Sequence, residues 1–411
     1  MDALHNKAPM KNVSRRTQSA EGISRRRFIY SSSATAVAVI SGCCSPNDDP
    51  RRQPRANYRS PGEKLNIGCI GLGGKGVSDV AVCDDENIVA LCDVDELKLK
   101  ACAKDYPQAK CYRDYRRMLD VQTGLDAIVI STPDHHHAPA ASRAIHLGKH
   151  VYCQKPLSHT VWEARHLAEL AHRKGVATQM GNQGHSYEGN RRMCEMIWSG
   201  AIGTVQEVHC WTDRAGRWWP QGMDIPIDND PVPLNLDWDL WLGPAPIRPF
   251  KSAWSNREPV YHPLAWRGWW DFGSGALGDM GCHIMDGPCW ALNLSAPSAI
   301  SVVESSARVE SSPPTWAIIR YEFPARGSMP PVSLIWYEGG KLPAKPKEME
   351  AAKLPDNGTL IVGTKGTILN NGYGTEPKLL PESRMKEYVF PPPQIPRIPD
   401  SNSHREWIRA C

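Results

Sequence analysis

Residues 65–93 contain the pattern that most restricts the fold of this chain. An apolar run, Leu65–Ile70, passes directly into the glycine-rich segment Gly71-Leu72-Gly73-Gly74-Lys75-Gly76. A helical segment follows at Val77–Cys83, and a second apolar run, Ile88–Cys92, ends at Asp93. Glycines at this spacing allow a tight turn and let the backbone approach a pyrophosphate at the start of a helix. The segment therefore predicts a β-α-β unit that binds a dinucleotide through Gly71, Gly73, Gly74 and Gly76.

The acid at the end of the second run bears on which dinucleotide is bound. A carboxylate at Asp93 can accept hydrogen bonds from the ribose hydroxyls of the adenosine, and it would repel a 2′-phosphate. This favours NAD over NADP. Lys75 weakens this preference for NAD, because a cation in the turn is able to bind a phosphate.

Apolar runs and helical segments continue to alternate after residue 93. Strands are expected at residues 125–131, 150–153 and 177–180, and helices at about 136–147 and 161–174. This alternation predicts a doubly wound parallel sheet, and hence a Rossmann domain over residues 63–181. Residues at the carboxyl ends of such strands face the ligand crevice. Those ends carry Thr132, Pro133, Gln154, Lys155 and Asn182.

Several short motifs, in a fixed order over about residues 65–300, carry a resemblance to a known family. They are the glycine turn, Cys92-Asp93-Val94-Asp95, Thr132-Pro133-Asp134 with His137, residues 148–157, Ile202-Gly203 and residues 278–283. Together they resemble the glucose–fructose oxidoreductase, inositol dehydrogenase and rhizopine-catabolism (Gfo/Idh/MocA) family. The resemblance implies an NAD-dependent enzyme that oxidises a CH–OH group. The expected cofactor-binding residues are then Gly71, Gly73, Gly74, Gly76, Asp93, Thr132, Pro133, His137, Gln154, Lys155 and Asn182.

The resemblance also implies the catalytic residues. The lysine of a Glu-Lys-Pro motif is catalytic in that family, and its Lys–Pro bond is often cis; Lys155 has Gln154 before it in place of the usual glutamate. Asp279 and His283 are four positions apart, which places them on one face if the segment is helical. The resemblance implies that His283 accepts the proton of the substrate hydroxyl, that Asp279 orients the imidazole, and that Lys155 bonds the reacting oxygen. The alternative is an ordinary Asp/His pair on a helix surface.

The pattern changes at residue 182, where a second domain is expected over residues 182–411. Runs at residues 205–211, 301–309, 316–322 and 332–337 alternate like antiparallel strands. We therefore expect an α+β domain with a mixed, largely antiparallel sheet. The resemblance implies that this sheet covers the substrate and forms an oligomer interface, so a homo-oligomer, dimer or tetramer, is expected. Residues 403–411 resemble the start of a helix, and a truncated C-terminus is left open, because family members usually continue with a further helical segment.

Eight tryptophans lie between Arg214 and Phe272, in a segment that is rich in proline. Flat aromatic faces suit the C–H surfaces of sugars, which makes a carbohydrate or cyclitol substrate plausible. The alternative for most of these rings is packing within a region of little regular structure. Trp269 and Trp270, which precede Asp279, are the substrate-side candidates, together with His185, which follows the last Rossmann strand.

The charge and the cysteine content of the chain argue against nucleic-acid-binding and metal-binding classes of protein. The formal net charge is +4, but residues 1–59 hold eleven basic and four acidic residues, so the rest of the chain has a net charge of −3. This gives no electrostatic case for binding nucleic acid. The thirteen cysteines form no Cys-x-x-Cys pair, and the adjacent residues His135, His136 and His137 point in different directions on a helix, so no metal site is predicted.

Residues 1–62 do not resemble part of a fold. Ser24-Arg25-Arg26-Arg27-Phe28-Ile29 resembles a twin-arginine export signal, and the apolar run after it, residues 31–42, is too short to span a bilayer. Ile40-Ser41-Gly42-Cys43 resembles a lipobox, which would place a lipid on Cys43; ordinary cleavage nearby is the alternative. Residues 45–62 resemble a disordered tether. We therefore expect export by the twin-arginine machinery to the periplasm.

Three functions follow from these patterns. The first is an exported oxidoreductase that transfers hydride between a sugar, glycoside or cyclitol hydroxyl and a tightly bound NAD. The second is a glycoside hydrolase or lyase that oxidises its substrate transiently, eliminates the glycosidic bond and then reduces the product. The third is a non-catalytic sensor, which the joint presence of Lys155, Asp279 and His283 disfavours.

Overall fold

The computed structural model describes residues 62–256, 258–349 and 353–411. The segments expected to form the twin-arginine signal, the lipidation site Cys43 and the tether lie outside these described residues, except for Gly62. None of the helices in the described ranges combines the length and the apolar character that crossing a bilayer requires.

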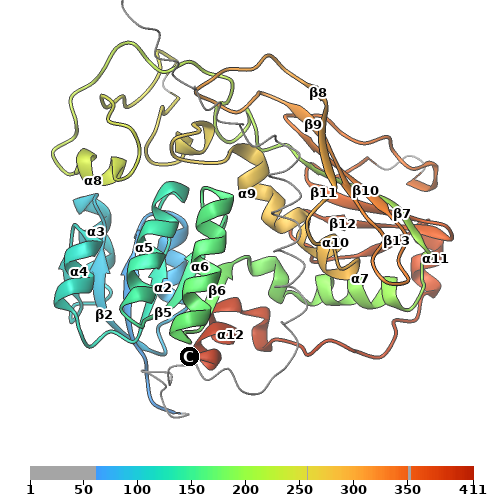
Figure 1. The fold of residues 1–411 in the computed structure, drawn as a ribbon, viewed down its shortest axis with the longest axis horizontal. Coiled ribbons are helices and arrows are strands. Elements are labelled where there is room, and N and C mark those ends of the chain that lie inside the picture. The colour runs from blue at the N-terminus through green and yellow to red at the C-terminus, as the bar shows by residue number, and fades with distance from the viewer. Residues whose placement is uncertain (1–61, 257, 350–352) are drawn as a thin grey trace, which may run out of the picture. The chain divides into compact units, whose positions relative to one another are not determined.

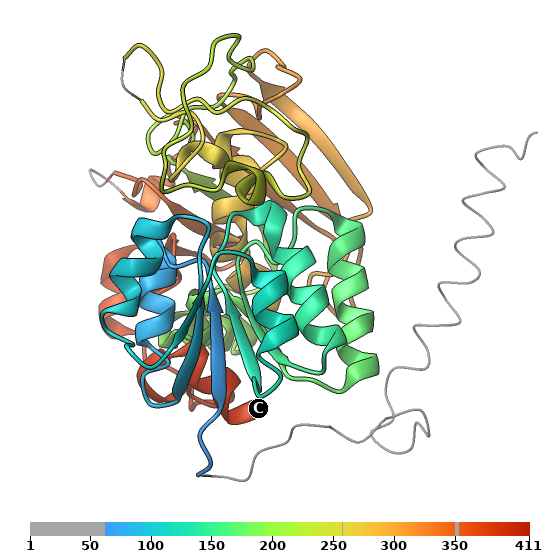
Figure 2. The same ribbon diagram turned by 90° about the vertical axis from the view of Figure 1, so that its left-hand side faces the viewer.

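The first half of the described chain forms the predicted parallel sheet (Figures 1 and 2). Its order is β3-β2-β1-β4-β5-β6, and each pair of neighbours is parallel. The strands are β1 (Asn66–Ile70), β2 (Asn87–Cys92), β3 (Lys110–Tyr112), β4 (Ala127–Ile130), β5 (His150–Gln154) and β6 (Thr178–Gly181). The order reverses between β1 and β4, and the ligand crevice of an open α/β sheet lies at such a switch point. The Rossmann prediction is thus confirmed.

Helices cover both faces of this sheet. They are α2 (Lys75–Ala81), α3 (Glu96–Ala103), α4 (Tyr115–Val121), α5 (Asp134–His146) and α6 (Val161–Lys174). The ends of α6 show how the local sequence sets these bounds. Thr160 and Glu163 form a capping box at its start, and Gly175 ends it with a φ of 64°, a conformation that glycine adopts without strain.

The second half forms a seven-stranded sheet within the described residues, in the order β13-β12-β11-β7-β10-β9-β8. Only β7 and β10 pair in parallel, so the predicted mixed and largely antiparallel sheet is confirmed. A core of buried apolar side chains packs α7 (Glu188–Trp198), α9 (Gly275–Ile284) and α10 (Asp286–Ala291) against it. The strands are β7 (Val205–Thr212), β8 (Ala299–Ser305), β9 (Ala317–Phe323), β10 (Val332–Glu338), β11 (Gly358–Gly363), β12 (Gly366–Asn371) and β13 (Lys378–Leu380).

The tryptophan-rich segment lies over the carboxyl edge of the Rossmann sheet (Figure 1). Its short helix α8 (Trp238–Leu242) places Trp238 and Trp241 in a stacked pair with ring centroids 4.7 Å apart. Several other rings of the segment are buried in the same apolar cluster, which includes Trp266 and Trp269. Packing is therefore the main role of these rings, as the alternative interpretation held.

Residues 403–410 form the helix expected at the end of the described chain, and this helix, α12 (Ser403–Ala410), packs on the Rossmann domain. Trp407 is 1% exposed in a core cluster with residues of β1 and β4. The ring of His404 stacks on that of Tyr152 in β5 at a centroid distance of 3.8 Å. Residues far apart in sequence thus complete one face of the first sheet. The short helix α11 (Glu382–Glu387) lies earlier, beside β13.

Candidate active site

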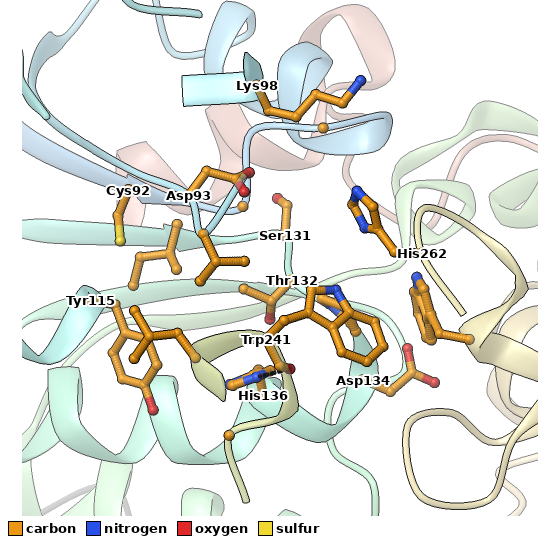
Figure 3. A pocket seen from close by; sticks show the side chains of 18 of the residues that line it. Cys92, Asp93, Lys98, Tyr115, Ser131, Thr132, Asp134, His136, Trp241 and His262 are labelled. Atoms are coloured by element: carbon orange, nitrogen blue, oxygen red, sulfur yellow. Dashed lines mark hydrogen bonds between the residues drawn. The ribbon is translucent and has the colours of Figure 1, made fainter. Parts of the chain in front are cut away.

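A cavity of about 780 Å³ lies along the carboxyl edge of the parallel sheet (Figure 3). The glycine turn and the ends of β2, β4 and β5 form its floor, and residues 239–244 and 262–267 of the tryptophan-rich segment also line it. Its volume is within the range of ligand sites, which is about 300–1,000 Å³. The predicted cofactor residues that line it are Gly71, Gly73, Gly74, Asp93, Thr132, Pro133, Gln154 and Lys155.

The glycine turn has the geometry that a dinucleotide requires. A Cβ on Gly71, whose φ is +84°, would lie 2.6 Å from the carbonyl oxygen of Ser131, and a Cβ on Gly76 would lie 2.0 Å from that of Gly71. These two glycines keep the turn, β4 and α2 in close contact. A Cβ on Gly74 would meet nothing within 4 Å, so the turn is open toward the cavity there. Gly76 itself is buried and packs the turn rather than lining the cavity.

Asp93 is held at the end of β2 by two backbone donors. Its Oδ2 accepts from the Leu72 N–H at 2.6 Å, and its Oδ1 accepts from the Asp95 N–H at 2.8 Å. Burial raises the pKa of this carboxyl from its ordinary value. Lys98, which Figure 3 labels above Asp93, is a cavity-lining cation that the sequence reasoning missed.

Lys75 is paired with an acid inside the Rossmann domain. Its Nζ contacts Oδ1 of Asp79, a fully buried carboxylate in α2 that also lies 3.3 Å from Nε2 of His404 in α12. Oδ2 of Asp79 accepts from Ser131 Oγ at 2.7 Å and from Gln154 Nε2 at 2.9 Å. The side chain of Gln154, in the position where the family has a glutamate, is thus held by a buried acid.

Lys155 and Asp279 form an ion pair that connects the two domains. Lys155 Nζ donates to Oδ1 of Asp279 at 2.6 Å and to its backbone oxygen at 2.8 Å, and the side chains are 13% and 5% exposed. Arg267 Nε donates to the same Oδ1 at 3.0 Å. Burial alone would raise the pKa of Asp279, but the charges of Lys155 and Arg267 outweigh it and hold that pKa below its ordinary value. The Lys155–Pro156 bond is cis, as the resemblance implies.

His283 has a different partner from the one expected. Asn182 Nδ2 donates to the Cys282 carbonyl at 2.7 Å, so Asn182 Oδ1 is an acceptor, and it lies 2.8 Å from His283 Nδ1. Nδ1 must therefore carry the proton, and Nε2 is left as the basic nitrogen. Burial lowers the pKa of His283 to about 3, so the imidazole is neutral at physiological pH.

Two sequence-based assignments need correction here. Asp279 does not orient His283, because its carboxylate is engaged by Lys155 and Arg267; Asn182 holds the imidazole instead. Asn182 is 3% exposed and does not line the cavity, so the structure places it behind the histidine rather than against the cofactor. The Asn182–His283 and Lys155–Asp279 contacts connect residues 101 and 124 positions apart, and helical spacing carries no information on them.

His137 also lies behind the cavity wall. Its ring is 1% exposed, with Nδ1 at 2.6 Å from the Pro156 carbonyl oxygen and Nε2 at 2.9 Å from that of Thr132. It joins the loops after β4 and β5 rather than contacting the cavity. Its neighbour His135 has its ring nitrogens near the carbonyls of Phe272 and Trp241, and His136 Nε2 is near the Trp241 carbonyl.

The three substrate-side candidates do not line the cavity. Trp269 is fully buried and donates from Nε1 to the Val260 carbonyl at 2.6 Å, and Trp270 is 44% exposed. His185 stacks on Trp290 and pairs with Asp286 at 2.9 Å. The tryptophans that do line the cavity are Trp241 and Trp266. The turn at Ala265–Gly268 explains the difference, because it places Trp266 at the cavity and turns Trp269 into the core.

Asp134 is a further residue of the site that the sequence reasoning did not single out as functional. It lines the cavity at the start of α5, is 3% exposed, and has Lys155, Arg267 and Asp279 as charged neighbours. Burial outweighs the two cations and raises its pKa to about 7. Thr132 adds a buried hydroxyl oxygen that has no hydrogen-bond partner in the described residues. A dinucleotide lying along this edge would offer such an atom a partner.

A parallel sheet with a glycine turn and a cavity along its carboxyl edge, joined to a second domain built on a mixed sheet, defines a two-domain dinucleotide-binding fold. Residues 65–182 match the sequence profile of an oxidoreductase family with an NAD-binding Rossmann fold, and residues 196–329 match that of its C-terminal alpha/beta domain. These matches cover more than half of the chain. The chain therefore belongs to the Gfo/Idh/MocA oxidoreductase family.

Similar proteins within this family have different names. The chain is 30% identical over 178 residues to "Glycosyl hydrolase family 109 protein 2" of Shewanella sp. (strain ANA-3), covering 37% of this chain and 38% of that protein. It is 26% identical over 151 residues to inositol 2-dehydrogenase of Salmonella typhimurium, and the match covers 35% of this chain and 45% of that protein. The match thus spans less than half of either relative. The WlbA dehydrogenase of Bordetella pertussis, solved with NADH and UDP-GlcNAcA, has the same fold, with a TM-score of 0.54, 17% identity and coverage of 77% and 83%.

Proposed function

We propose that this protein oxidises a CH–OH group of a sugar, glycoside or cyclitol, with NAD as the hydride acceptor. The observation that carries the proposal is the contact between Lys155, which lines the cavity, and Asp279 of α9. Asp279 and His283 lie behind this lining, and the neutral His283, one helical turn further along α9, has an unprotonated Nε2. Oxidation of an alcohol needs a proton acceptor and a positioned cation at the reacting oxygen.

Bound NAD would supply the site that accepts the hydride. The chain's own residues handle the proton and the charge. His283 Nε2 takes the hydroxyl proton, and Asn182 keeps the imidazole in the required tautomer through Nδ1. The ammonium of Lys155, with Arg267 beside it, stabilises the negative charge that develops on the oxygen as the proton leaves. Asp279 fixes both cations through one carboxylate oxygen.

The test begins with the small molecules released from the denatured, purified protein, identified by mass spectrometry. We expect NAD, and a predominance of NADP would contradict the choice of cofactor. Turnover is then measured with a panel of sugars and cyclitols and an artificial electron acceptor. Lys155→Ala and His283→Ala should lower turnover by about 100-fold or more, while His166→Ala, at a half-buried histidine of α6 that stacks on Trp162, should not change it. Unchanged turnover in both site variants would refute the proposal.

A second function, cleavage of a glycosidic bond through transient oxidation, is supported by the names of the similar glycosyl hydrolase family 109 proteins. Oxidation beside the glycosidic bond acidifies the neighbouring C–H and allows elimination, and reduction then restores the cofactor. Release of the aglycone from an aryl glycoside without net formation of NADH would favour this function. Net NADH formation with no cleavage would favour the simple dehydrogenase.

We also propose that the protein is exported by the twin-arginine route and carries its cofactor with it. The run Arg25-Arg26-Arg27, followed by Phe28 and an apolar run, supports this proposal. Replacement of these three arginines by lysine should leave the protein in the cytoplasmic fraction of an expressing bacterium. Labelling with a radioactive fatty acid, compared between the original chain and Cys43→Ser, tests the lipid anchor.

A further inference from the structure

We propose that the substrate carries an anionic oxygen group, a carboxylate or a phosphate, and that Arg214 binds this group next to His283. The inference rests on the proposed oxidoreductase function and specifies its substrate class. It starts from an imbalance of charge around Asp279, whose partners Lys155 and Arg267 line the cavity.

Among the described residues, three cations surround one ionised carboxylate. Asp279 lies 2.6 Å from Lys155 Nζ, 3.0 Å from Arg267 Nε and 4.0 Å from Arg214 Nη1. The other acid nearby, Asp134, is only partly ionised at neutral pH because burial raises its pKa to about 7. The imidazole of His283 is neutral, so it cancels none of the excess positive charge. Positive charge that is removed from water is stable only when an anion accompanies it.

Arg214 is the cation with the poorest partners. Its side chain is 16% exposed, and its guanidinium lies over the ring of Trp218 at 3.9 Å. Nη2 donates to the hydroxyl of Tyr373 at 3.1 Å, but Nε is buried and has no hydrogen-bond partner in the described residues. The distance of 4.0 Å between Arg214 Nη1 and Asp279 Oδ2 is too long for a hydrogen bond. Asp279 Oδ2 is also buried, and it has no hydrogen-bond partner in the described residues.

Asp213, the acid next to Arg214 in sequence, does not balance the positive charge of Arg214. Asp213 contacts Arg217 and accepts a hydrogen bond from Asn357 at 3.0 Å. A guanidinium offers five donors in a planar fork that matches a carboxylate or a phosphate. Arg214 therefore has the donors, the stacking and the low exposure of a binding arginine, and no carboxylate of the described residues is in hydrogen-bond contact with it.

Tyr373 places this arginine beside the proposed base. Its hydroxyl bonds Arg214, and its ring centroid lies 4.9 Å from that of His283. An anion on Arg214 would thus belong to the molecule whose hydroxyl faces His283. Arg267 is less suited to the role, because its Nε already donates to Asp279.

The experiment measures ligand binding to the NADH-loaded protein by calorimetry, so that turnover is not required. The probes are glucuronate and galacturonate, glucose 6-phosphate, and the neutral glucose, galactose and myo-inositol. We expect at least one anionic probe to bind tenfold or more tightly than its neutral counterpart, and added salt to weaken it. The uronates and the phosphate ester distinguish the two sources of the anion.

Arg214→Gln should reduce the affinity for the anionic probe to that of its neutral counterpart, and Arg214→Lys should restore part of it. The matched control is Arg320→Gln, an arginine in β9 that is 42% exposed and pairs with Glu322, and it should change nothing. Melting temperatures of both Arg214 variants show whether they fold. No preference for an anionic member of any pair, or a preference that Arg214→Gln leaves intact, would overturn the inference.

Turnover with the same probes separates the inference from the function on which it rests. Equal oxidation of neutral and anionic sugars, unaffected by Arg214→Gln, would reject the anion site and leave the oxidoreductase standing. Binding of an anionic sugar through Arg214, with no oxidation of any probe, would keep the site and reject the oxidoreductase.

Discussion

His283 donates its Nδ1 proton to Asn182 Oδ1 over 2.8 Å, and this bond decides which nitrogen of the imidazole is basic. The amide cannot reverse its role without breaking its own bond to the Cys282 carbonyl at 2.7 Å. The imidazole nitrogen that we propose as the proton acceptor is thus set by the residue that follows the last Rossmann strand. The histidine itself comes from α9 in the other domain.

Removal of the Asn182 amide should therefore damage catalysis rather than binding. We expect Asn182→Ala to lower kcat by about 10- to 100-fold with little change in KM, and His283→Ala to lower it by about 10²- to 10⁴-fold, the range of general base catalysis. Steady-state kinetics on the best substrate of the panel measure both. An Asn182→Ala enzyme that changes KM alone would mean that Asn182 contacts the substrate or cofactor instead.

Gln154 and Asp79 should behave as a coupled pair. Gln154→Glu places a second carboxylate against a fully buried one, and two like charges at this distance cannot both ionise without cost. We expect a lower melting temperature and NADH affinity reduced by about tenfold, roughly 1.4 kcal/mol. Asp79→Asn should restore much of this loss when it is combined with Gln154→Glu. A double-mutant cycle on NADH affinity gives the coupling, and strict additivity would contradict it.

Asp134 should make the protein less stable as the pH rises. Its folded-state pKa, about 7, lies above its ordinary value of 3.8, so the folded state holds a proton that the unfolded state releases. The contribution of Asp134 to the free energy of unfolding is full below the unfolded-state pKa, and it is lost as the pH rises through the folded-state pKa. We expect the melting temperature of Asp134→Asn, relative to the original protein, to increase between about pH 4 and about pH 7. A difference that is constant over this range would show that Asp134 does not titrate there.

Asp93 should control the choice between NAD and NADP. Asp93→Ser removes the carboxylate that repels a 2′-phosphate and leaves Lys98, which also lines the cavity. We expect the ratio of the two dissociation constants to shift toward NADP by about tenfold or more, from the loss of a charged hydrogen bond worth about 1.5–3 kcal/mol. Fluorescence titration with NADH and NADPH measures the ratio. Tighter binding of NADPH than of NADH by the unaltered protein would refute this role.

Strand β8 should form part of a homo-oligomer interface. It is the outer strand of the second sheet, all seven of its residues are exposed, and Ile300 and Val302 are 62% and 64% exposed. An exposed apolar edge strand favours pairing with another chain. We expect Ile300→Lys with Val302→Lys to reduce the mass measured by light scattering after gel filtration. Leu97→Lys, at an equally exposed apolar position in α3, is the control and should leave the mass unchanged.

The sequence was sufficient to predict the parallel sheet, because alternating strands and helices and the glycine turn are local patterns. It also identified Lys155, which lines the cavity, and it singled out Asp279 and His283, which are buried in α9 behind that lining. It did not predict their partners. The bond from Asn182 to His283 and the ion pair of Lys155 with Asp279 join elements of different domains, and Arg214 and Arg267 come from segments with little regular structure. Packing in three dimensions determines such contacts, and no residue spacing encodes them.

The return of α12 to the first sheet has a consequence for how the chain is synthesised. Asp79 pairs with His404, and Trp407 fills a core that β1 and β4 begin to form more than 250 residues earlier. A ribosome releases the glycine turn long before it makes the helix that covers this side of the same sheet. The core of the nucleotide-binding domain therefore remains incomplete until translation of the described chain is nearly finished. The late synthesis of α12 thus determines when this domain, which is made first, becomes fully stable.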